Sequence, residues 1–306
     1  MRIMTQELTK TYDRKRKALD DISIDFNLNG IFSIIGRNGA GKTTLVRILS
    51  TELLPTSGKG LINGMDVVED AEEVRQLIAV VPQEARPLPW LTPLQTVSSY
   101  LMWRGYSYRE AREKGKEALR ELGLGGQEGE KSRKLSGGQK RKLMVATVIA
   151  SEAPIVFLDE PTTGLDYISR KDLWQLLSKM KKDRLIILTT HYLEEAEILG
   201  DLIMILEHGK LVDIGGIDDL RSKVKLPYVL KVYSENFKVD EEGLQVHPVS
   251  EKETFVYGTA SKIYSLIPYL VTNKMKFTVE EASLSNIFEQ YIGGEEGGEE
   301  NEEESW

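Results

Sequence analysis

The feature that most constrains this chain of 306 residues is the stretch 36–44, which reads Gly-Arg-Asn-Gly-Ala-Gly-Lys-Thr-Thr. It matches the pattern of a phosphate-binding loop, in which a glycine and four further residues precede Gly-Lys-Thr. The apolar run at 31–35 indicates a buried strand before the loop, and the apolar spacing at 45–49 indicates a helix after it. Such a loop presents backbone amides and the positive end of a helix dipole to an anion. The sequence therefore predicts a binding site for a nucleoside triphosphate.

The residues of this loop suit different parts of that ligand. Its three glycines can adopt backbone angles that other residues avoid, which lets amides approach a phosphate closely. Lys42 is expected to reach the β- and γ-phosphates, and the Thr43 hydroxyl is expected to hold Mg²⁺. A glycine-rich turn that contains a lysine by chance is the alternative, and the flanking strand and helix disfavour it. The ATP-binding candidates in the loop are Gly36, Asn38, Gly39, Gly41, Lys42, Thr43 and Thr44.

The negative charge of the chain is concentrated at its C-terminus. Residues 293–306 hold seven glutamates and no lysine or arginine, and without those seven charges the net −8 of the chain becomes −1. A body this close to neutrality gives no reason to expect nucleic acid as a partner. The composition of residues 293–306 predicts disorder, with a solvating role as the simpler interpretation and docking onto a basic partner as the alternative.

Two compositional features exclude other classes of function. The chain has no cysteine, which excludes disulfides, thiolate metal sites and cysteine nucleophiles. It has no apolar run long enough to span a bilayer, and its N-terminus lacks the apolar segment of a signal peptide. Any role at a membrane is therefore expected to come through a partner.

Strands and helices alternate along the first two thirds of the chain, which predicts an α/β core. The run Ile-Val-Phe-Leu at 155–158 is continuously apolar, as in a parallel strand that is buried on both faces. The strands expected are 3–8, 22–26, 31–35, 59–64, 78–83, 155–158, 185–188 and 202–206. Between them, helices are expected after the phosphate-binding loop, from Pro93, over 107–122, 136–149 and 169–182, and near Glu194. Capping boxes are expected at Ser107 and Ser136.

From about Asp218 the pattern changes to that of a small α+β domain of roughly 70 residues. Strands are expected over 228–239, 254–257 and 277–279, and helices over 262–273 and 284–291. The predicted organisation is an ATPase domain at 1–217 with a helical subdomain at about 88–150, an accessory domain at 218–292, and the acidic tail 293–306.

A pair of carboxylates follows the apolar strand 155–158. Asp159 sits where a carboxylate can hold Mg²⁺ directly or through water. Glu160 is placed to orient or deprotonate a water that attacks the γ-phosphate. The alternative is a polar strand end that turns at Pro161, and the phosphate-binding loop in the same chain makes that interpretation the weaker one.

Several motifs, taken together, resemble those of the ATP-binding-cassette (ABC) ATPases. Leu-Ser-Gly-Gly-Gln at 135–139, the signature segment, resembles the motif that names that family. Tyr12 resembles the aromatic residue that stacks on adenine, and Gln83 resembles the glutamine of the Q-loop. Gly164-Leu165-Asp166 resembles the D-loop, and His191 resembles the switch histidine that contacts the γ-phosphate. These motifs occur in the family's order and cover residues 1 to about 215.

The resemblance implies a P-loop NTPase (RecA-like) core, an antiparallel β subdomain, a helical subdomain and a small C-terminal α+β domain. It implies ATP and Mg²⁺ as ligands and a head-to-tail homodimer with two ATP molecules at its interface. Ser136 and Gly138 would then contact the ATP of a second copy, whereas the alternative is that Ser136 only caps its own helix. Tyr12 could likewise be a turn residue that packs on a sheet. The implied catalytic residues are Glu160, His191 and Lys42, and the implied metal ligands are Thr43, Gln83 and Asp159.

The segments 90–93, 108–111 and 279–288 are similar to exporter cassettes that dock on a separate permease and handle drugs, lipids or polysaccharides. This implies a cytoplasmic ATPase subunit, peripheral on the inner face of the cell membrane. The stretch 139–142, Gln-Lys-Arg-Lys, is more basic than many signatures. One alternative is an ATP-switched clamp on ribosomes or DNA. The other is a GTPase or kinase, disfavoured because the nearest guanine-reading pattern, at 273–276, lacks its aspartate.

Overall fold

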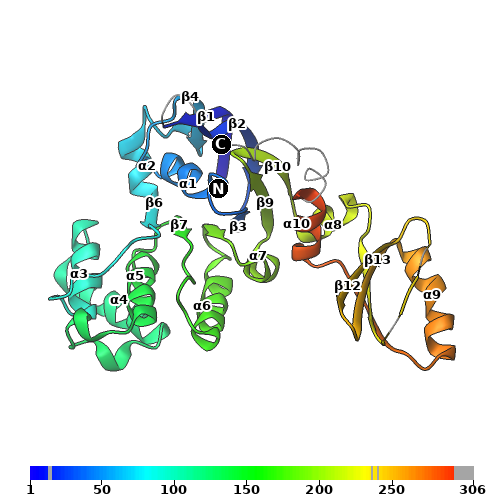
Figure 1. Ribbon diagram of the computed structural model, residues 1–306. Coiled ribbons are helices and arrows are strands. Elements are labelled where there is room, and N and C mark those ends of the chain that lie inside the picture. The colour runs from blue at the N-terminus through cyan, green and yellow to red at the C-terminus, as the bar shows by residue number, and fades with distance from the viewer. Residues whose placement is uncertain (13–15, 236, 240, 293–306) are drawn as a thin grey trace, which may run out of the picture. The chain divides into compact units, whose positions relative to one another are not determined.

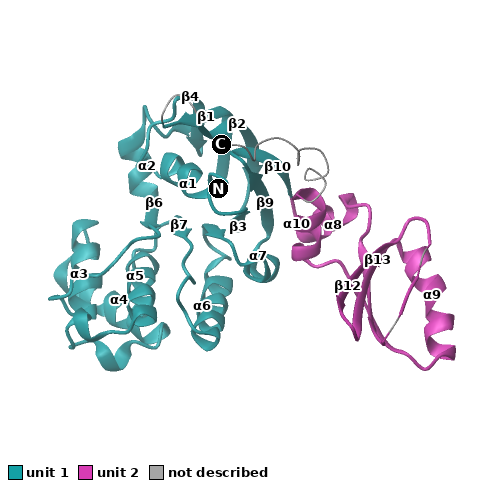
Figure 2. Cartoon of the chain, in the orientation of Figure 1, with its two compact units in different colours: residues 1–214 teal, residues 215–306 magenta. Residues whose placement is uncertain are grey.

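The computed structural model describes residues 1–12, 16–235, 237–239 and 241–292. The chain divides into two compact units, Met1–Ile214 and Gly215–Trp306, which Figure 2 shows in different colours. The acidic tail 293–306 lies outside the described residues. Within the described residues, no helix is both long enough and apolar enough to cross a bilayer.

A six-stranded sheet forms the centre of the first unit (Figure 1). Its order is β10 (Lys210–Gly215), β9 (Leu202–Glu207), β3 (Gly30–Ile35), β8 (Leu185–Thr190), β7 (Ile155–Asp159) and β6 (Ile78–Val81). β9, β3, β8, β7 and β6 pair in parallel. Every residue of β3, β7 and β8 is buried, which agrees with the continuous apolar runs of a parallel sheet covered on both faces.

A second sheet is antiparallel and has the order β2 (Lys17–Asn27), β1 (Arg2–Thr11), β4 (Ser57–Ile62) and β5 (Met65–Asp66). The helix α1 (Lys42–Leu49) shares one apolar core with both sheets of this unit. Leu45 of α1, Ile22 of β2 and Phe32 of β3 are fully buried in that core. The packing fixes the loop between β3 and α1, because both flanking elements are immobilised in one core.

Three helices form a cluster at one end of the first unit: α3 (Pro93–Trp103), α4 (Tyr108–Glu121) and α5 (Gly137–Ala150) (Figure 1). Each begins with a capping box, at Thr92, Ser107 and Ser136, so the sequence prediction of both Ser caps is confirmed. Short 3₁₀ turns at Gly125–Gln127 and Ser132–Lys134 connect α4 to α5. The remaining helices of the unit are α2 (Ala71–Leu77), α6 (Tyr167–Met180) and α7 (Leu193–Leu199).

The second unit contains a four-stranded antiparallel sheet and, among its described residues, three helices. The sheet has the order β12 (Gln245–Ser250), β13 (Glu253–Gly258), β11 (Tyr228–Tyr233) and β14 (Lys276–Glu281). α9 (Ala260–Thr272) packs on one face through Ile263, Leu266 and Leu270. The other helices are α8 (Ile217–Lys223) and α10 (Leu284–Ile292), which contact each other.

The sequence prediction of an α/β P-loop fold is confirmed, whereas one strand boundary was wrong and several elements were not predicted. The strand expected over 228–239 ends at Tyr233, because no described strand pairs with the chain beyond that residue. β12 was not predicted, since its residues are mostly exposed and it contains Pro248, features of an edge strand. The charged helix α2 was missed as well, because Val74 is its one buried residue and leaves almost no apolar periodicity.

Candidate nucleotide-binding site

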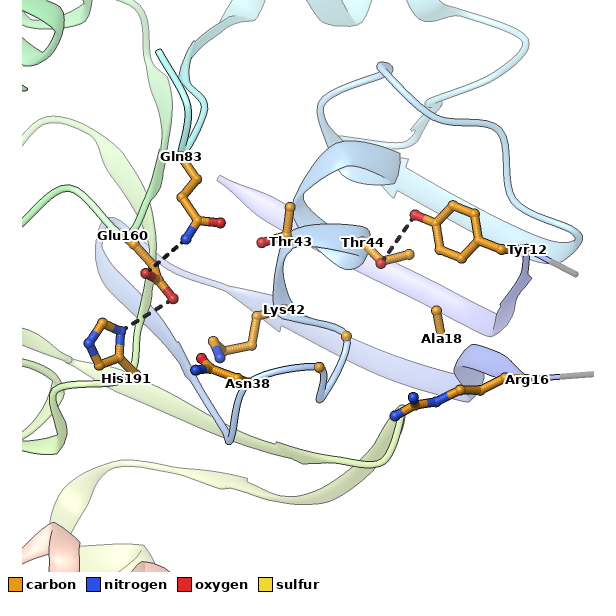
Figure 3. Close-up of a pocket in the computed structure, with 12 residues that line it drawn as sticks. Tyr12, Arg16, Ala18, Asn38, Lys42, Thr43, Thr44, Gln83, Glu160 and His191 are labelled. Carbon is orange, nitrogen blue, oxygen red and sulfur yellow. Dashed lines mark hydrogen bonds and ion pairs between the residues drawn. The ribbon is translucent and has the colours of Figure 1, made fainter. Parts of the chain in front are cut away.

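A cavity of about 610 Å³ lies beside the loop between β3 and α1, within the size range of small-molecule sites. Figure 3 shows Glu160 between Gln83 and His191 at one end of this cavity and Tyr12 near the other. The residues that line it are Tyr12, Arg16, Ala18, Asn38, Gly39, Gly41, Lys42, Thr43, Thr44, Gln83, Glu160 and His191. Ten of these twelve are candidates from the sequence, and the structure brings them together.

The phosphate-binding loop depends on glycine at two tightly packed positions. Gly41 has φ +106°, a conformation that side chains rarely adopt, and a Cβ there would collide with the carbonyl oxygen of Ala18. Gly36 has no room for a Cβ either, since the Leu206 carbonyl oxygen occupies that space. The loop backbone therefore lies closer to its neighbours than any other residue type would permit.

Lys42 is buried within the loop that it belongs to, with 6% of its surface exposed. Its Nζ donates hydrogen bonds to the Gly36 carbonyl at 2.8 Å and to the Arg37 carbonyl at 3.0 Å. Burial lowers the pKa of Lys42, and the charges of Glu160, Asp159 and Glu207 oppose that shift. The ammonium is thus held at the loop, in position to meet a phosphate oxygen.

Thr43 and Asp159 form the arrangement that fits a magnesium ion. The Thr43 hydroxyl donates to Asp159 Oδ1 at 3.3 Å, and the Thr189 hydroxyl donates to the same carboxylate oxygen. Among the described residues there is no group of three or more His, Cys, Asp or Glu that could hold a metal by itself. One hydroxyl and one carboxylate are what Mg²⁺ takes from a protein when phosphates and waters supply its other ligands.

Glu160 has polar partners from three loops around the cavity. Its Oε2 accepts hydrogen bonds from Gln83 Nε2 and from the Thr163 hydroxyl, each at 3.1 Å. Its Oε1 lies 3.3 Å from Nδ1 of His191. The residue is 7% exposed and has φ +49°, an uncommon value for a side-chain-bearing residue. The carboxylate is therefore nearly buried and held in one orientation, as a positioned general base requires.

Tyr12 lies at the other end of the cavity with half of its surface exposed. Its hydroxyl is 3.4 Å from the Thr44 hydroxyl, and Lys10 Nζ is 5.5 Å from the centre of its ring. An exposed aromatic ring at a cavity end suits stacking on a purine. Stacking on a purine and the alternative of a turn tyrosine that packs on a sheet are both compatible with this position.

Arg16 and Ala18 also line the cavity and were missed from the sequence. Arg16 precedes β2 and Ala18 lies near its start, and both reach the phosphate-binding loop because β2 packs against α1. No sequence pattern predicts that this part of the chain lies beside the phosphate-binding loop. Arg16 adds a positive charge at the cavity wall near Gly39.

Four candidates do not line the cavity: Gly36 and Asp159, which lie directly behind it, and Ser136 and Gly138 at the start of α5. The Ser136 hydroxyl accepts a hydrogen bond from the Gln139 amide at 3.2 Å, so within one chain it caps α5. Both interpretations of Ser136 remain compatible with this geometry, because the exposed start of α5 can also face an anion from outside.

The arrangement combines a buried ammonium, a hydroxyl beside a carboxylate, and a nearly buried carboxylate next to an imidazole. The ammonium can neutralise phosphate charge, as could a Mg²⁺ ion beside Thr43 and Asp159, and the Glu160 carboxylate can orient a water for attack on phosphorus. These groups together are suited to cleavage of a phosphoanhydride bond.

Comparisons with known proteins agree with this interpretation. The family model described as ABC transporter matches residues 19–163. The chain is 39% identical over 210 residues to the retinal-specific phospholipid-transporting ATPase ABCA4 of Mus musculus, across 68% of this chain and 9% of that protein. It is 35% identical to ABC transporter A family member 7 of Dictyostelium discoideum, across 93% of this chain and 36% of that protein. The chain thus spans about a third or less of the length of these relatives.

Among solved structures, the dimeric ATP-binding cassette MJ0796, in a post-hydrolysis state bound to ADP and Pi, matches with a TM-score of 0.65. The sequence identity is 27%, and the match covers 70% of this chain and 98% of that one. Fold, motif order and relatives lead to one conclusion: the chain belongs to the ABC transporter family and carries that family's ATP-binding cassette.

Proposed function

We propose that this chain binds ATP with Mg²⁺ in the cavity of its first unit, hydrolyses it, and drives a membrane permease carried on a separate chain. The observation that carries this proposal is the position of Glu160 between Gln83 and His191, beside the loop that holds Lys42. The similarity to the MJ0796 cassette, which was solved in a post-hydrolysis state with ADP and Pi, supports hydrolysis rather than binding alone.

Each residue has a role in this proposal. Tyr12 stacks on adenine, and the amides of the loop together with Lys42 bind the β- and γ-phosphates. Thr43, Asp159 and the side-chain carbonyl of Gln83 would hold Mg²⁺, which would neutralise phosphate charge. Glu160 orients and deprotonates the attacking water, and His191 contacts the γ-phosphate.

We propose further that two copies assemble head to tail, so that Ser136 and Gly138 of one copy complete the site of the other. The similarity to MJ0796, a bacterial cassette whose structure is dimeric, supports this assembly. The location of both residues at the start of α5, where Ser136 is exposed and neither lines the cavity, supports it as well. A two-fold axis makes such an arrangement self-complementary, so both sites would be alike.

The permease partner has a candidate surface in the helical cluster. Trp103 is 81% exposed and Trp90 62% exposed, both within the segment that includes α3. Exposed tryptophans at a surface are typical anchors of protein interfaces. Docking there would place the chain on the cytoplasmic face of the cell membrane, as the resemblance to exporters predicts. The comparisons are with transporters and do not favour the ribosome or DNA clamp.

The proposal is tested with Glu160→Gln, which preserves shape and removes the base. ATP hydrolysis is expected to fall by a factor of about 10² to 10⁴, while ATP affinity and ATP-dependent dimerisation persist. Glu194→Gln is the matched control, because it makes the same chemical change at an exposed position outside the cavity. An unchanged turnover in Glu160→Gln would contradict the catalytic role. Copurification with a detergent-solubilised permease, compared between wild type and Trp103→Ala, tests the partner.

A further inference from the structure

Arg141 has an unusual environment within the signature helix α5. Its side chain is 5% exposed, and all five of its N–H donors have acceptors. Every acceptor is a backbone carbonyl. They are the carbonyls of Pro82, Gln83, Asp159, Glu160 and Pro161. The guanidinium therefore connects the loop after β6 to the loop after β7.

These five hydrogen bonds can form together in only one relative arrangement of the loop after β6 and the loop after β7. Nη1 donates to Pro82 at 3.0 Å and to Gln83 at 3.1 Å, while Nη2 donates to Glu160 at 2.9 Å. Burial lowers the pKa of Arg141, so the cation is held away from water and depends on these carbonyls. A shift of either loop would leave a buried N–H donor unpaired, which is unfavourable because the donor cannot turn to water instead.

The same contacts fix the backbone of the catalytic glutamate. Glu160 has a positive φ, which is costly unless its surroundings hold it. The Glu160 amide donates to the Thr189 carbonyl at 3.1 Å and to the Thr189 hydroxyl at 3.0 Å, whereas its carbonyl accepts from Arg141. Both ends of this residue are thus held, and Arg141 provides one of them.

The position of Arg141 in α5 connects these contacts to the signature segment. Ser136 caps the start of the helix, and Arg141 lies five residues later in its second turn. Ser136 and Gly137 at the start of α5 are exposed, whereas Arg141 is buried and donates to both loops. A rigid helix therefore joins the signature segment to the backbone of Gln83 and Glu160.

We infer that Arg141 is a positioning residue, which aligns Gln83 and Glu160 and transmits contact at the signature segment of a chain to that chain's own catalytic loops. This inference rests on the proposed function. Lysine cannot replace this arginine, because its three donors share one nitrogen and cannot span two loops.

The experiment measures ATP hydrolysis, binding of a fluorescent ATP analogue and thermal unfolding for the full chain and for Arg141→Lys and Arg141→Met. Both variants are expected to lose about 10- to 100-fold in kcat, with KM and analogue binding little changed, since misplaced catalytic groups slow chemistry rather than binding. In the Glu160→Gln background, Arg141→Lys is expected to weaken ATP-dependent dimerisation while ATP binding persists.

Arg184→Lys is the matched control. Arg184 is a partly buried arginine that donates at 3.2 Å to the Ile149 carbonyl of the same helix, and it does not line the cavity. A kcat within twofold of wild type for Arg141→Lys, or a loss of kcat that only follows the folded fraction as in Arg184→Lys, overturns the inference. A wild-type chain that fails to hydrolyse ATP contradicts the proposed function instead.

Discussion

Glu195 of α7 is fully buried next to the site. Substitutions of Glu195 can separate the effect of its charge on stability from the effect of its hydrogen bonds. The Trp174 indole N–H donates to Glu195 Oε1 at 2.8 Å, and the Thr162 hydroxyl donates to Oε2 at 3.1 Å. The carboxylate thereby joins α6, α7 and the loop that follows Glu160. Burial raises the pKa of Glu195, opposed by hydrogen bonds from Thr190, Trp174 and Thr162 and by the charge of Arg170.

Two substitutions of Glu195 are expected to differ sharply. Glu195→Ala leaves the buried donors of Trp174 and Thr162 without this acceptor, at about 1–3 kcal/mol each, so the loss from these two contacts is about 2–6 kcal/mol before any cavity cost. Glu195→Gln retains both contacts, because its carbonyl accepts from Trp174 and its amide donates to the Thr162 hydroxyl. The free energy of unfolding of the Gln variant is therefore expected to lie within about 1.5 kcal/mol of the wild-type value near pH 5.

The pH dependence distinguishes these variants further. A raised native pKa means that the native state holds its proton more tightly than the unfolded chain, whose glutamates titrate near pKa 4.3. As pH rises from that value through the raised pKa, the unfolding free energy of wild type falls relative to Glu195→Gln. Urea unfolding followed by tryptophan fluorescence between pH 4 and 8 measures the difference. A Gln variant that becomes less stable than wild type as pH rises would refute the reasoning, and Glu194→Gln controls for the exposed neighbour.

Three further predictions concern the cavity. Gly41→Ala is expected to abolish ATP binding in equilibrium dialysis, because the new Cβ collides with the Ala18 carbonyl; retained affinity would show that the loop can rearrange. Tyr12→Ala is expected to weaken ATP binding by about 1–3 kcal/mol in calorimetry and Tyr12→Phe by less, whereas equal losses would exclude stacking. Thr43→Val is expected to raise the Mg²⁺ concentration needed for hydrolysis, since it removes the hydroxyl beside Asp159; an unchanged Mg²⁺ dependence would place the metal elsewhere.

The parts of the site that the sequence predicted are those with local patterns. A strand, a glycine-rich loop and a helix follow one another within residues 30–49, so the phosphate-binding loop is recognisable without tertiary information. The caps at Ser107 and Ser136 likewise involve residues three positions apart. These features involve residues that are close together in the chain, so the sequence alone predicts them.

The parts that the sequence did not predict depend on contacts between distant segments. Arg16 and Ala18 reach the cavity through the packing of β2. Arg141 belongs to a segment with a basic character that the sequence shows, but its five acceptors are backbone carbonyls, which every residue type offers. A hydrogen bond to a carbonyl places no constraint on the partner's side chain, so no residue pattern records it.

The order of the strands explains how motifs so far apart in the chain form one site. β3, β8, β7 and β6 are adjacent and parallel, so their carboxyl ends meet at one edge of the sheet. The phosphate-binding loop follows β3, His191 follows β8, Glu160 follows β7 and Gln83 follows β6. With neighbouring strands about 4.8 Å apart, the four ends span about 14 Å, a row long enough for a triphosphate, a metal ion and a water. Chain order places Gln83 second, whereas sheet order places it last, beside Glu160. The contacts of Glu160 with both His191 and Gln83 follow from this topology, since β7 lies between β8 and β6.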